Sequence, residues 1–136
     1  MTGVVVDASV ALAWCFPDEG SKEADRMLAA LKGITIFVPA VWSLEIANAI
    51  LVGERRKRLK HPEILRFLAL LESLPVSQDD QTVSESITHV LPLARAHGLS
   101  AYDAAYLELA IRHNCPVATF DSGLEKAAKD ARIDIF

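Results

Sequence analysis

Residues 3–9 read Gly-Val-Val-Val-Asp-Ala-Ser, and this stretch decides the fold class. Three consecutive β-branched residues without polar alternation are typical of a strand buried on both faces, as in a parallel sheet. Asp7 falls where this strand ends and a helical pattern begins. Ligands of open α/β sheets bind just beyond the carboxyl ends of the strands, so Asp7 is a candidate site residue. The alternative is that Asp7 only caps the following helix.

Length and composition predict one domain over residues 1–136. The chain is 51% hydrophobic and carries a net charge of −4, so we expect a generous core and little disorder. No apolar run approaches the roughly 20 residues of a membrane span, and the first residues do not resemble a signal peptide. We therefore expect a cytoplasmic protein with two reduced cysteines. The acidic balance by itself argues against nucleic-acid binding, which usually requires a basic surface.

Strand and helix patterns alternate along the chain. Further strands are expected at 35–38 and 116–120, with shorter candidates at 75–77 and 133–136. Residues 17–20 break the first helix, and Ser21 is a plausible N-cap for the next. Helices are expected over 10–16, 22–32, 41–58, 61–74, 82–97, 100–114 and 122–131. This order predicts an α/β fold, with a parallel sheet of four to five strands covered by helices on both faces.

Two of these helices carry specific expectations. The helix over 41–58 is apolar around much of its girth, which predicts that it is largely buried. Pro92 lies inside the pattern of the helix over 82–97 and is expected to kink it or divide it in two.

Four acidic residues lie in positions that are unusual for a solvated surface. Asp7 and Asp121 each end an apolar strand, Asp103 lies in the first turn of an alanine-rich helix, and Glu45 lies between two apolar residues. Each residue also has an ordinary explanation. Asp7 and Asp121 would cap helices, Asp103 would interact with a helix dipole, and Glu45 would extend to solvent. Strand ends and the helix starts that follow them meet at one edge of a parallel sheet, so we expect the four to converge.

Converging carboxylates need neutralisation. At about 5 Å and an effective dielectric near 20, each pair repels by about 3 kcal/mol. Protons or cations must therefore balance the cluster. Oxygen ligands without Cys or His select hard ions such as Mg²⁺ or Mn²⁺. Such ions activate water and stabilise in-line displacement at phosphorus, so the residues predict a metal-dependent phosphodiesterase.

Four ordered blocks of the sequence resemble those of PIN-domain ribonucleases, and most closely the VapC toxins of toxin–antitoxin pairs. The blocks are 5–9, 45–48, 99–104 with 106–107, and 118–121, and they extend over nearly the whole chain. The resemblance implies a PIN-like α/β/α sandwich. It also implies an RNA substrate, a protein antitoxin and a homodimer.

The resemblance implies an acidic Mg²⁺ or Mn²⁺ site whose catalytic and metal-binding residues are Asp7, Glu45, Asp103 and Asp121. By the same resemblance, the hydroxyls of Ser9 and Thr119 would bond to ligands or carboxylates. Asn48, about one helical turn beyond the glutamate, would support the metal site or contact substrate. Tyr102 and Tyr106 match positions expected to serve in packing.

The leading hypothesis is therefore an endoribonuclease toxin. A phosphatase of the haloacid dehalogenase type would need a second aspartate where Ser9 stands. A non-catalytic PIN-like binding module, acting through a protein partner, is the third possibility. Without the four site carboxylates the remaining charge is balanced, which weakens the objection from net charge. The basic run 55–60 fits phosphate binding and, equally, cations at the end of a helix.

Overall fold

Four parallel strands form the centre of the molecule in a computed structural model, which describes residues 3–16 and 22–136. Their order across the sheet is β3-β2-β1-β4. The strands are β1 (Val4–Val6), β2 (Ile36–Val38), β3 (Val76–Gln78) and β4 (Val117–Ala118). Val5 pairs with Phe37 of β2 on one side and with Val117 of β4 on the other. The parallel α/β sheet expected from the sequence is confirmed, with four strands.

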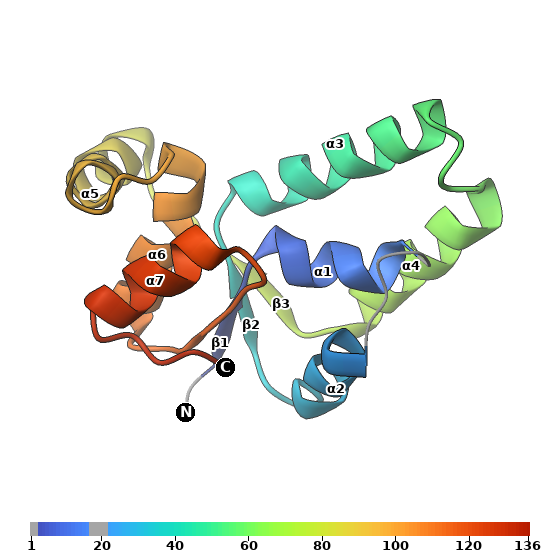
Figure 1. Ribbon diagram of the computed structural model, residues 1–136, viewed down its shortest axis with the longest axis horizontal. Helices are drawn as coiled ribbons and strands as arrows, with labels where there is room; N and C mark the ends of the chain where they lie inside the picture. Colours follow the sequence, from blue (N-terminus) through green and yellow to red (C-terminus); the bar gives the residue numbers. More distant parts are fainter. Residues whose placement is uncertain (1–2, 17–21) are drawn as a thin grey trace.

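Helices connect and cover the strands. The helices of the described residues are α1 (Ala8–Cys15), α2 (Lys22–Ala30), α3 (Val41–Arg55), α4 (His61–Ser73), α5 (Val83–His97), α6 (Ala101–His113) and α7 (Ser122–Asp130). Helix α6 packs on β1, β2 and β4 and is flanked by α5 and α7, whereas α1 is surrounded by α2, α3 and α4 (Figure 1). This arrangement is the α/β/α sandwich.

The core is built around β1. All three of its valines are completely buried, as the run without polar alternation predicts. Because the strands are parallel, the end of β1, the end of β4 and the starts of α1 and α7 all lie at one edge of the sheet (Figure 1). This carboxyl edge positions the candidate site.

Several expected boundaries need correction. The strand expected at 133–136 is reduced to a single parallel bridge between Val117 and Ile135. The expected break at 17–20 and the N-cap Ser21 lie outside the described residues. The expected division at Pro92 does not occur, since α5 is continuous from Val83 to His97. Thr88 and Pro92 are both exposed, so the carbonyl that loses its amide partner remains accessible to water.

Helix α3 differs from expectation in length and in burial. It ends at Arg55 because Lys57 adopts a left-handed φ of 59°, which turns the chain back on the helix. It is not largely buried, since Leu44 is 70% exposed and Leu51 is 43% exposed. No helix within the described ranges is long and apolar enough to cross a membrane.

Candidate active site

Asp7 lies at the end of β1 and is only 5% exposed. It occupies the N-cap position of α1 but makes no side-chain capping bond, which rules out capping as the role of its carboxylate. The hydroxyls of Ser9 and Thr119 instead donate to its Oδ2, at 2.8 and 2.7 Å. Burial raises the pKa of Asp7, the two hydroxyl bonds oppose this, and the charge of Asp121 raises it further.

The hydroxyls of Ser9 and Thr119 also accept hydrogen bonds from the residues that follow β4. The Phe120 amide donates to Ser9 Oγ at 3.0 Å, and the Asp121 amide donates to Thr119 Oγ1 at 3.0 Å. Asp121 is exposed, and its Oδ2 caps α7 by accepting from the Leu124 amide at 2.8 Å. The ordinary explanation by capping therefore holds for Asp121, although its charge still acts on Asp7.

Glu45 lies in the second turn of α3 and is held by a residue of α6. Tyr106 OH donates to Glu45 Oε1 at 2.6 Å. Burial is the main cause that raises the pKa of Glu45, the tyrosine bond lowers it, and the charges of Asp7 and Asp103 raise it again. The glutamate is thus fixed inside the site instead of extending freely to solvent.

Sequence reasoning missed the role of Tyr106. The side chain is completely buried, and burial followed by its bond to Glu45 raises its pKa. A buried tyrosine hydroxyl usually needs a partner, and Tyr106 follows Asp103 by one helical turn; this spacing was the available signal. The expectation that Tyr102 serves in packing is wrong, because its side chain is 64% exposed.

Asp103 lies in the first turn of α6 and is half-buried. Its amide donates to the N-cap oxygen of Ser100 at 3.1 Å, and a side-chain hydrogen bond with Ser100 lowers the pKa of its carboxyl. Burial raises its pKa, and the charges of Asp121 and Asp7 raise it further. Because the charges of Asp7 and Asp121 act on the Asp103 carboxylate, α6 must place this carboxylate near them, at the carboxyl edge of the sheet.

The four carboxylates therefore form one electrostatic group. Neighbouring carboxylates raise the pKa of Asp7, Glu45 and Asp103, and no basic side chain in the described part of the chain offsets this. As they stand, no three Asp, Glu, His or Cys side chains of residues 3–16 and 22–136 are close enough to hold a metal ion. The donor chemistry nevertheless fits a hard cation, because the group offers only oxygen atoms and excess negative charge.

Asn48 lies about one turn beyond Glu45 on α3. Its side chain is exposed and makes no hydrogen bond with the described residues. It does not orient the carboxylates in this structure, which leaves contact with substrate as its candidate role.

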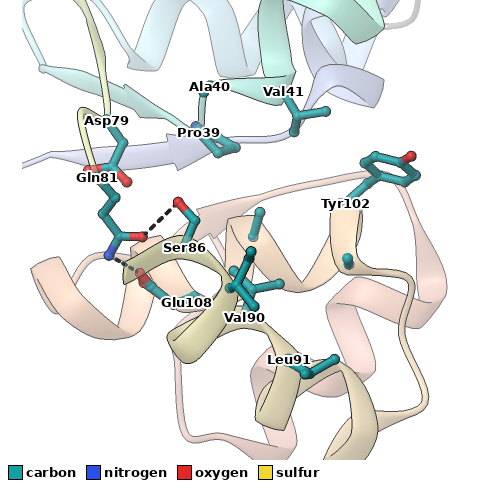
Figure 2. Close-up of a pocket in the computed structure, with 13 residues that line it drawn as sticks. Pro39, Ala40, Val41, Asp79, Gln81, Ser86, Val90, Leu91, Tyr102 and Glu108 are labelled. Atoms are coloured by element: carbon teal, nitrogen blue, oxygen red, sulfur yellow. Dashed lines mark hydrogen bonds between the residues drawn. The ribbon is translucent and has the colours of Figure 1, made fainter. Parts of the chain in front are cut away.

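A cavity of about 370 Å³ opens between the start of α3 and helices α5 and α6. Figure 2 shows Tyr102 on one side of it and Glu108 deep on another. Glu108 is 6% exposed and accepts from Gln81 at 2.8 Å and from Arg112 at 2.9 Å. Arg112 also donates to both carboxylate oxygens of Asp79. Because these acids are matched by a cation, the cavity is an apolar hollow beside the site and not a second carboxylate cluster.

Comparison with known proteins places this geometry in a family. The sequence model of the PIN domain family matches residues 4–130, so the chain belongs to this family. It is 30% identical over 121 residues to ribonuclease VapC3 of Pyrobaculum aerophilum, a match that covers 89% of this chain and 91% of that protein.

Solved structures share the fold. The crystal structure of PAE2754 from Pyrobaculum aerophilum superposes with a TM-score of 0.71 at 25% identity and covers 98% of this chain and 84% of that one. FitAcB from Neisseria gonorrhoeae gives a TM-score of 0.63 at 18% identity, over 98% and 96% of the two chains. FitAB bound to an IR36 DNA fragment gives 0.65 at 18%, over 98% and 93%. The resemblance to PIN domains expected from the sequence is confirmed.

Proposed function

We propose that this protein is a metal-dependent endoribonuclease that hydrolyses RNA phosphodiester bonds, and that it is the toxin of a toxin–antitoxin pair. The observation that carries the proposal is the group of four interacting carboxylates at the carboxyl edge of a PIN-domain sheet. The similarity of this chain to a protein named as a VapC ribonuclease supports both RNA as the substrate and the role as a toxin.

The metal would be Mg²⁺ or Mn²⁺, held by Asp7, Glu45, Asp103 and Asp121. Burial and mutual repulsion disfavour the charged carboxylates, so a divalent cation would restore the ionised state that suits its own binding. When bound, such an ion supplies activated water and stabilises the charge that develops during in-line displacement at phosphorus.

The chain's own residues hold the carboxylates in place. Ser9 and Thr119 fix Oδ2 of Asp7, and Tyr106 fixes Oε1 of Glu45. Ser100 bonds to the Asp103 carboxyl, but burial and the charges of Asp121 and Asp7 outweigh this bond and raise the pKa of Asp103, which suits it to accept a proton from the attacking water. The exposed amide of Asn48, about one helical turn from Glu45, would contact the RNA.

Cleavage of RNA by the purified chain tests the proposal. We expect cleavage with Mn²⁺ or Mg²⁺ and none with EDTA. Asp7→Asn should lose about 10²- to 10⁴-fold, because stabilisation by a bound metal ion is worth several kcal/mol and each 1.4 kcal/mol is about tenfold in rate. Asp134→Asn is the matched control, since Asp134 is exposed and belongs to no part of the site. Wild-type rates in Asp7→Asn, or equal rates with EDTA, would refute the assignment.

We further propose a homodimer and a protein antitoxin as partners in the cytoplasm. Three exposed large apolar side chains line the cavity on α5 and α6, and they are Ile87, Leu91 and Tyr102. Leu44 on α3 is also exposed. A second copy that buries this face would remove apolar area from water. Sedimentation of wild type and of Ile87→Glu tests this, with a dimer and a monomer as the respective expectations; a monomeric wild type would contradict it.

A further inference from the structure

A cluster of basic side chains lies at the end of α3 and in the turn before α4. This basic corner consists of Arg55, Arg56, Lys57, Arg58 and Lys60, which are five of the 14 Lys and Arg residues of the chain. All five are exposed. Figure 1 shows the corner at the end of α3 that lies away from α5 and from the carboxyl edge of the sheet. One helix thus joins the acidic site to the basic corner.

Most of the charge of this corner is unneutralised. Within the described ranges Arg55, Arg56, Lys57 and Lys60 form no ion pair. Other basic residues do form ion pairs, as Arg112 does with Asp79 and Glu108. The corner therefore keeps its positive potential available to a ligand, in a chain whose net charge is negative.

The backbone of the corner is held in place by packing. The amides of Arg58 and Leu59 both donate to Gly53 O, at 2.8 and 3.3 Å, and Leu59 is 5% exposed. The Arg58 guanidinium lies 4.7 Å from the centre of the Phe16 ring. A Cβ on Gly53 would come within 2.8 Å of the same ring, so the close approach requires glycine. The basic side chains therefore extend from a fixed turn.

Lys57 is an unusual residue for its position. Its φ of 59° is left-handed, where glycine is the usual choice after the end of a helix. A lysine keeps a charge there at a cost in backbone energy. The helix dipole explains Arg55 in the last turn and Arg56 at the C-cap, but its effect fades beyond them and does not explain Lys57 or Lys60.

The distance from site to corner suits a short length of nucleic acid. Arg55 follows Glu45 by ten positions along α3, which is about 15 Å at 1.5 Å per residue. A stacked strand advances by about 3.4 Å along its axis per nucleotide, so about four to five nucleotides would reach the corner. Between Glu45 and Arg55 the sequence has one acidic residue, the exposed Glu54 next to the corner, and the exposed Asn48 lies on the way.

We propose that the basic corner binds the phosphates of an RNA strand whose scissile bond lies at the carboxylates, and that it makes the enzyme favour strands long enough to reach it. This inference rests on the proposed ribonuclease function. A polyanionic strand matches the corner better than a protein surface does, because the corner offers charge and little apolar area.

Binding and cleavage of a 3-nucleotide and a 12-nucleotide RNA test the inference. Binding is measured by fluorescence anisotropy in EDTA, and cleavage is measured in Mn²⁺. The corner variant carries R55Q, R56Q, K57Q and K60Q. The control variant, matched in charge, carries R26Q, K32Q, R95Q and K126Q, all at exposed positions. Thermal unfolding checks that both variants fold.

We expect the corner variant to bind the 12-nucleotide RNA about 10- to 100-fold more weakly at low salt than the control variant. The slope of log affinity against log salt should fall by about 2 to 3, at about 0.7 per lost phosphate contact on a single strand. Affinity for the 3-nucleotide RNA and kcat should stay unchanged. KM for the 12-nucleotide RNA should rise.

Three results would overturn the proposal. They are equal affinities of the two variants for the long strand, equal weakening for the short and the long strand, and wild-type binding of an oligoglutamate of matched charge as tightly as RNA. If the wild type does not cleave RNA, the proposed function fails, whereas the binding comparison in EDTA still decides the role of the corner.

Discussion

The ends of β1 and β4 carry the same local pattern, an apolar strand followed by an aspartate and a helix, yet the two aspartates differ in environment. Asp7 is 5% exposed, makes no capping bond and accepts two hydroxyl hydrogen bonds. Asp121 is exposed and caps α7 through the Leu124 amide. β1 lies between two other strands, whereas β4 lies at the edge of the sheet. Position in the sheet, and not the local pattern, decides the role of each carboxylate.

Thr119 connects the two strand ends, because its hydroxyl donates to Asp7 and accepts from the Asp121 amide. We expect Thr119→Val to lower RNA cleavage about 10- to 100-fold, the range seen when partners of metal ligands are removed. The measurement is kcat/KM at saturating and at limiting Mn²⁺. A conservative control is Thr119→Ser, which keeps the hydroxyl and should retain most activity; equal losses in both variants would show that the hydroxyl is not what matters.

Removal of the cap at the end of β4 should destabilise the fold. Asp121→Ala is expected to lower the free energy of unfolding by about 1 kcal/mol, as loss of an N-cap typically does. Asp121→Asn retains a good capping residue and should change it by a few tenths at most. Denaturant unfolding in EDTA measures both. A loss as large in the asparagine variant as in the alanine variant would contradict the assignment of Asp121 as a cap.

At the end of β1 we expect the opposite sign. Asp7→Asn removes a buried charge while it keeps an acceptor for the hydroxyls of Ser9 and Thr119, so the melting temperature without metal should rise by a few degrees. Differential scanning calorimetry in EDTA measures this change, and a fall in melting temperature would show that the ionised carboxylate stabilises the fold.

The pH dependence of this difference provides the most detailed comparison. The pKa of Asp7 is raised on folding, so its ionisation costs stability as pH rises through the folded-state pKa. As pH falls, the wild-type carboxyl takes up a proton and the advantage of Asp7→Asn should shrink. We expect the widest gap in melting temperature near pH 7 to 8 and the narrowest near pH 4, without divalent ions; a gap independent of pH would contradict the raised pKa.

Much of the fold is encoded in local sequence. The three valines of β1 define a strand buried on both faces, and alternation of strands with helices defines a parallel sheet. The exposure of α3 could not be predicted, because Leu44 and Leu51 look like core residues until the other helices are placed. The strand at 133–136 was overestimated because β4, its neighbour, has only two residues with which to pair.

The site was less completely predictable. The sequence pattern indicates that Asp7 and Asp121 share an edge of the sheet, and the structure gives their carboxylates a mutual interaction. The bond from Tyr106 to Glu45 joins residues 61 apart in the chain, and no local pattern specifies such a contact. The cavity beside the site depends on three helices at once and is equally invisible to residue spacing.

Helix α3 runs without interruption from Glu45 to the basic corner. The distance between the carboxylates and the corner is therefore fixed by the number of helical residues between them. A helix turns by about 100° and advances about 1.5 Å with each residue. Insertion of one alanine between Asn48 and Gly53 would swing the corner by more than a quarter turn away from its present bearing. Insertion of four would return it almost to the same face, about 6 Å farther out. The number of residues in α3 thus determines where a bound RNA strand would contact the basic corner.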